Sequence, residues 1–93
     1  MQVKRIEMSP VRQVPGTPLV QADLRLFLFD ASGLAAGHAM LSCSVSGAEG
    51  ADARGLGERL VGEAQRQMSR MPEYRSGRNR LTFLTFSPVP MAA

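Results

Sequence analysis

Residues 20–46 alternate between apolar and polar side chains on both sides of a short turn, and this pattern limits the fold more than any other feature. A period of two is typical of a β-strand that buries one face. With the turn at residues 30–33, the segment is predicted to fold back on itself as an antiparallel hairpin. One face of this hairpin is wholly apolar and consists of Ala22, Leu24, Leu26, Leu28, Ala39, Leu41, Cys43 and Val45.

The opposite face of the hairpin is polar at its base and apolar near its tip. In the simplest register, Phe27 lies opposite Met40 and Phe29 lies opposite His38. The single helix expected in the chain must cover the other, wholly apolar face. These four residues are therefore expected to form an exposed patch of the kind that marks an interface. Burial of the patch under the N-terminal segment or the proline-rich tail is an equally weighted alternative.

The rest of the chain predicts two more strands and one helix. Residues 3–8 alternate imperfectly, which indicates a first strand with a bulge. Asp52 is a good N-cap for a helix with apolar residues at three- to four-residue spacing, and Pro72 ends that helix. Residues 81–86 are apolar on both parities, as expected for a last strand covered on two faces.

The element order is thus strand, strand, strand, helix, strand, with the second and third strands at about 19–29 and 38–46. This order predicts the α+β class, a small antiparallel or mixed β-sheet with one helix packed on one face. If the last strand joins the third in parallel, the helix forms a right-handed crossover. We expect one domain over residues 1–93, with an extended, proline-containing tail at residues 88–93.

Composition restricts the cellular setting of the chain. Residues 26–29 form too short an apolar run for a signal peptide or a membrane span, so a cytoplasmic protein without membrane contact is expected. A single cysteine allows no internal disulfide, which also suits a reducing compartment. Ten arginines against one lysine, with many alanines and glycines, indicate a GC-rich genome and a bacterial or phage origin.

The sequence offers little for catalysis. His38 is the only histidine and Cys43 the only cysteine, and their odd separation places them on opposite faces of a strand. Cys43 is expected to be a plain buried thiol. The segment at residues 47–50 lacks the spacing of a phosphate-binding loop and carries Glu49, whose charge would oppose a phosphate. We therefore predict a non-enzymatic protein with no metal, no cofactor and no small-molecule substrate.

Positive charge is concentrated in the last third of the chain. Residues 64–93 contain five arginines and one acidic residue, Glu73, a balance of +4 within a net charge of +3. Such a segment can bind phosphates through salt-sensitive contacts. The candidate nucleic-acid-binding residues are Arg66, Arg70, Arg75, Arg78 and Arg80.

Taken together, these features favour a protein–protein interaction or assembly module that acts by stoichiometric binding. Its partner would be another protein or a second copy of the chain, bound through Phe27, Phe29, His38 and Met40 and an exposed strand edge. Nucleic-acid binding through the arginine-rich last third is the alternative.

Overall fold

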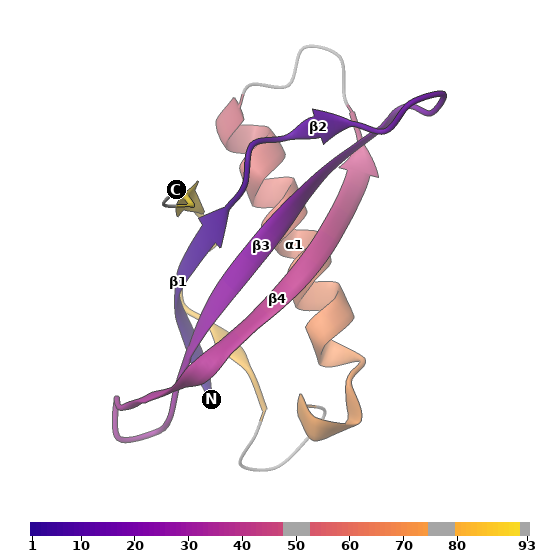
Figure 1. The fold of residues 1–93 in the computed structure, drawn as a ribbon. Coiled ribbons are helices and arrows are strands. Elements are labelled where there is room, and N and C mark those ends of the chain that lie inside the picture. The colour runs from indigo at the N-terminus through magenta and orange to yellow at the C-terminus, as the bar shows by residue number, and fades with distance from the viewer. Residues whose placement is uncertain (48–52, 75–79, 92–93) are drawn as a thin grey trace.

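Two long antiparallel strands, β3 (Leu19–Phe29) and β4 (Ala35–Ser46), form the centre of the computed structural model. Helix α1 (Ala53–Ser69) lies across one face of the sheet, behind β3 and β4 in Figure 1. The α+β class, with one helix on a mixed sheet, is confirmed. The structure describes the chain apart from residues 48–52, 75–79 and 92–93.

Shorter strands complete the sheet on the far side of β3 from β4. β1 (Gln2–Met8) and β2 (Arg12–Gln13) follow each other along β3, and both are antiparallel to it. After α1 and a short 3-10 helix, η1 (Pro72–Tyr74), the chain returns to the outer side of β1. There β5 (Thr82–Phe83) and β6 (Val89–Pro90) pair in parallel with the two ends of β1.

The core lies between α1 and the apolar face of the sheet. Every second residue of β3 from Ala22 to Leu28 is buried, and α1 contributes residues spaced by one helical turn. Fully burying each of the larger aliphatic side chains contributes about 1.5–3 kcal/mol, so this layer supplies most of the stability of a small domain. The buried apolar residues are Val3, Ile6, Ala22, Leu24, Leu26, Leu28, Cys43, Leu60, Val61, Ala64 and Met68.

The predicted faces of the hairpin are confirmed, but the predicted register is wrong by two residues. Phe27 pairs with His38, and Met40 lies opposite Arg25. The tip itself is where the sequence places it: the backbone N–H of Gly33 donates to the carbonyl of Asp30, and the N–H of Asp30 donates to that of Leu34. The difference arises beyond the tip, where the register shifts between Leu28 and Phe29 because β4 has one extra residue.

This bulge keeps the apolar residues of β4 on the core face. Phe29 pairs with Ala35, and a regular ladder from that pair would place Leu24 opposite Met40. A one-residue slip of this kind sends every side chain of a strand to the other face. The bulge restores the match, since Leu24 instead lies opposite Leu41. Gly37, next to the bulge, has φ of 124°, a conformation that suits glycine.

Replacing Gly37 by valine is expected to lower the free energy of unfolding by about 1–3 kcal/mol. No atom lies within 4 Å of a Cβ built at Gly37, so the loss would come from backbone strain and not from a steric clash. Chemical denaturation measures it. Ala36→Val is the matched control, because Ala36 is exposed and has negative φ, and it should change stability by less than about 0.5 kcal/mol. Equal losses in both variants would contradict this account of the bulge.

Other boundaries also differ from the prediction. β4 begins at Ala35, three residues earlier than expected, and the last strand is reduced to Thr82–Phe83. Leu84 and Phe86 were expected to be covered but are 55% and 42% exposed. The strand is short because the chain leaves the edge of β1 after Phe83 and rejoins it only at β6, within the predicted extended tail.

Two further sequence-based predictions concern the N-cap of α1 and contact with a membrane. The proposed N-cap, Asp52, lies outside the described residues. Within the part of the chain that the structure describes, no helix has both the length and the apolar character needed to cross a membrane.

Candidate interaction surface

The tip patch, defined as Phe27, Phe29, His38 and Met40, lies on the face of the sheet opposite α1. The ring centroids of Phe27 and His38 are 6.2 Å apart, and the rings are tilted by 43°. His38 is exposed, Met40 is 49% exposed, and the two phenylalanines are half-buried. The structure therefore brings the four predicted residues onto one face of the two central strands, with Phe27 beside His38 in place of Met40.

Cations from β1 border the two phenylalanine rings. Lys4 Nζ lies 5.3 Å from the centroid of Phe29, and Arg5 Cζ lies 6.0 Å from that of Phe27. Contacts at these distances are favourable cation–π interactions. The N-terminal strand thus flanks the rings. The tail joins the sheet at Glu7 and Met8, as a strand beside β1.

An ion cluster continues from this border toward the middle of the face. The buried carboxylate of Glu7 accepts hydrogen bonds from Arg5 (3.1 Å) and Arg25 (3.3 Å). Nε of Arg25 has no hydrogen-bond partner among the described residues. Because both arginines bind one carboxylate, their side chains are held in place beside the tip patch.

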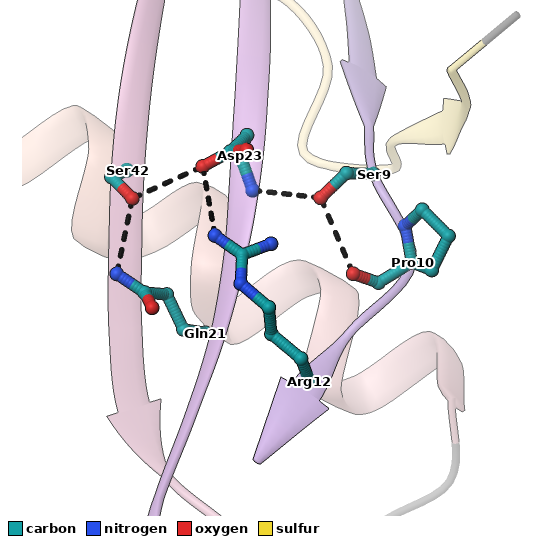
Figure 2. A network of polar contacts seen from close by, with 6 residues as sticks. All are labelled: Ser9, Pro10, Arg12, Gln21, Asp23 and Ser42. Carbon is teal, nitrogen blue, oxygen red and sulfur yellow. Dashed lines mark hydrogen bonds and ion pairs between the residues drawn. The ribbon is translucent and has the colours of Figure 1, made fainter. Parts of the chain in front are cut away.

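A polar network around Asp23 and Ser42 lies on the same face, farther from the hairpin tip than the tip patch. Figure 2 shows its contacts. Asp23 Oδ1 accepts hydrogen bonds from Arg12 and from Ser42, each at 3.1 Å, and these hold the pKa of its carboxyl below the ordinary value. The backbone N–H of Asp23 donates to Ser9 Oγ at 2.9 Å. The Ser9 hydroxyl thus replaces a backbone acceptor where β1 ends and the chain turns at Pro10 toward β2.

The two edges of the sheet differ in length and chemistry. On one edge, β5 and β6 are two residues each, and the chain there contains Pro88 and Pro90. On the other edge, β4 has twelve residues and pairs only with β3 among the described strands. β4 contains no proline, lysine, arginine, aspartate or glutamate. Its outer backbone groups therefore form a long, uncharged edge that can accept another strand.

The structure places three of the five arginines of the alternative prediction. Arg66 donates to Glu63 on the same helix, at 2.9 Å from Nε to Oε2, and this contact lowers the pKa of the Glu63 carboxyl. Arg70 is exposed one turn later. Arg80 lines a cavity of about 230 Å³ together with residues of α1 that include Ser69. Arg75 and Arg78 lie outside the described residues.

Cys43, the candidate nucleophile, and His38, the candidate base, lie on opposite faces of the sheet. Cys43 is fully buried on the core face, and desolvation raises the pKa of its thiol to about 11. His38 is exposed on the opposite face. Among the described residues, no group of three His, Cys, Asp or Glu side chains is arranged to hold a metal ion.

An apolar cavity of about 280 Å³ lies between residues 8–11 and residues 88–91. It is lined by Met8, Ser9, Pro10, Val11, Pro88, Val89, Pro90 and Met91, none of which carries an ionisable side chain. These residues supply no acid, base or charge for a reaction.

Comparisons with known proteins add no identification: no protein-family model, curated protein or solved structure matches the chain. The interpretation therefore depends on the surface itself. Sequence reasoning missed Lys4 and Arg5 as neighbours of the phenylalanine rings. Only the pairing of β1 with β3 brings these two side chains next to Phe27 and Phe29. Sequence reasoning also missed that β4 forms the edge, although a signal was present: residues 31–48 contain no charged side chain.

Proposed function

We propose that the chain is a non-enzymatic interaction or assembly module that binds another protein stoichiometrically through the tip patch and the edge of β4. The observation that carries this proposal is the long, uncharged edge of β4 beside a patch in which His38 and Met40 are exposed and the two phenylalanines are half-buried. An unpaired edge supplies backbone hydrogen bonds, and adjacent apolar side chains supply specificity. A cytoplasmic protein of bacterial or phage origin remains our expectation for its setting.

The spatial arrangement of the tip supports this use. In Figure 1 the β3–β4 turn projects to one side, away from α1. Residues 35–38 of β4 are exposed, and Met40 follows on the face of the sheet opposite α1, called the open face below. A partner strand can therefore approach the first half of β4 without displacing the helix. Because Lys4 and Arg5 flank the same rings, an acidic side chain of a partner could pair with the border of the patch.

A photo-crosslinking amino acid in place of Met40 tests the proposal inside cells. We expect protein adducts of defined mass, because a side chain on the open face next to the edge would lie within the contact. The same amino acid in place of Gln13, which is exposed in β2, is the matched control and should give few adducts. Absence of adducts at Met40, or equal adducts at both sites, would remove the proposal.

Nucleic-acid binding is the second candidate, favoured by the position of Arg80 beside α1, which carries Arg66 and ends one residue before Arg70. Such binding would weaken with added salt and would be lost on combined Arg70→Ala and Arg80→Ala substitution. No retention of labelled single-stranded DNA or RNA at low salt would eliminate this candidate. Retention that requires those arginines but not Met40 would favour it over the protein-binding proposal.

A further inference from the structure

We propose that β4 pairs in antiparallel orientation with β4 of a second copy, so that two sheets join into one continuous sheet. This inference rests on the proposed function and names its partner. It starts from the difference between the two edges. Natural sheets protect their edges with short strands, prolines and charges, and the β5–β6 edge has short strands and two prolines. β4 is long, with twelve residues, and contains no proline and no charged residue. Its only protective feature is the bulge close to its start.

The strand is complementary to itself in charge and in pattern. Two copies related by a twofold axis through Ser42 would place Ser42 opposite Ser42 and Leu41 opposite Cys43 of the second copy. Residues of equal parity oppose each other in this register, so core face meets core face and open face meets open face. No like charges are opposed, because the strand contains no charged residue.

The two charged side chains of β3 nearest the seam, Asp23 and Arg25, each pair with an opposite charge in the same chain, Arg25 with Glu7 at 3.3 Å. Asp23 lies opposite Ser42 on β3, one strand in from the edge, and its carboxylate pairs with Arg12 at 3.1 Å. The seam strand itself has no charged residue although the chain has a net charge of +3. A strand of a different protein could not be selected by charge complementarity, because β4 has no charged residue with which it could pair. A neutral strand of the same pattern fits, and a second copy supplies it.

The seam is long enough to hold a dimer. In the register centred on Ser42, residues 38–46 of each copy are paired, which spans roughly 30 Å. Such a ladder forms roughly nine backbone hydrogen bonds, close to the number in a typical protein interface. Met40, which is 49% exposed, and the half-buried Leu41 would lose further exposed area in the pair.

Sedimentation and light scattering of the full chain test this pairing. The wild type is expected to have twice the mass of one chain. Ser42→Lys would oppose two like charges at the centre of the seam and weaken association by about tenfold. Gln13→Lys adds the same charge on β2, across β3 from the β4 edge, and should leave the mass unchanged. Mixing Ser42→Lys with Ser42→Glu should restore a dimer that contains one copy of each.

A cysteine crosslink tests the register independently. Ser42→Cys in a Cys43→Ala background has one thiol per chain, and facing residues of an antiparallel pair are close enough for a disulfide. We expect a covalent dimer on mild oxidation, and none from Ser32→Cys at the hairpin turn in the same background. Circular dichroism confirms that each variant is folded. A dimer that neither crosslinks at position 42 nor responds to Ser42→Lys would use another surface and would overturn the proposal.

The outcomes separate this inference from the proposed function. A monomer at all accessible concentrations, together with Met40 adducts to a different protein, would overturn self-pairing and leave the interaction module standing. A monomer without Met40 adducts would overturn both. Salt-sensitive nucleic-acid binding by a monomer without protein adducts would also overturn both.

Discussion

Replacing Leu24 by alanine is expected to lower the free energy of unfolding by about 2–5 kcal/mol, the usual range for a buried leucine. Leu24 is fully buried in the centre of β3, opposite Leu41, with α1 on the same face. In a domain of this size, each kcal/mol corresponds to about 4–8 °C of melting temperature. Thermal and chemical denaturation would therefore show the largest loss of any single truncation discussed here.

Met40→Ala provides the matched control for this prediction. Met40 lies opposite Arg25, the residue after Leu24 on β3, but its side chain faces away from the helix and is 49% exposed. Its truncation should change the stability of the monomer by less than about 0.5 kcal/mol. Similar losses for Leu24→Ala and Met40→Ala would mean that the two faces of the hairpin are not distinguished as described.

Glu7→Ala is expected to lower the free energy of unfolding by about 1–3 kcal/mol. Glu7 is buried on the open face, where it accepts hydrogen bonds from Arg5 and Arg25. Without the carboxylate, two guanidinium groups would face each other with no anion between them. The side chains of these arginines are 56% and 36% exposed, and solvent limits the repulsion. Chemical denaturation at low and high salt measures the effect.

Two further variants separate charge from packing at this site. Arg5→Ala leaves the contact between Glu7 and Arg25 in place and should cost less than about 1 kcal/mol. Glu7→Gln keeps the shape of the side chain and should lie between the wild type and Glu7→Ala. The deficit of Glu7→Ala should shrink with added salt, because salt screens the two arginines from each other. A Glu7→Ala variant as stable as the wild type would show that the cluster does not stabilise the fold.

Alternation was enough to predict the two faces of the hairpin, because burial on one side leaves a period-two pattern that needs no knowledge of the rest of the fold. It was not enough to predict the register. The turn at Asp30 and the apolar pattern of β4 demand pairings that differ by one residue, and the bulge beside Gly37 reconciles them. That conflict is present in the sequence, but its position in the strand depends on backbone geometry.

The candidate surface was predictable in its residues and not in its setting. Phe27, Phe29, His38 and Met40 could be assigned to one face from parity alone. The position of β4 at the edge of the sheet could not be predicted, because it depends on β1 pairing with β3 across a separation of roughly twenty residues. The strand at residues 81–86 illustrates the same limit: its apolar pattern is strong, but only Thr82 and Phe83 find a partner strand.

The pairing of β1 with β5 and β6 has a consequence for the order of folding. β1 is synthesised before the other described strands, yet the backbone N–H groups of Leu84 and Met91 donate to the carbonyls of Val3 and Met8. During translation, the hairpin of β3 and β4 and then α1 emerge before those donors exist. Closing such distant pairings is slow compared with forming local structure. The growing polypeptide therefore carries β1 with one side open until nearly all of the described residues have left the ribosome.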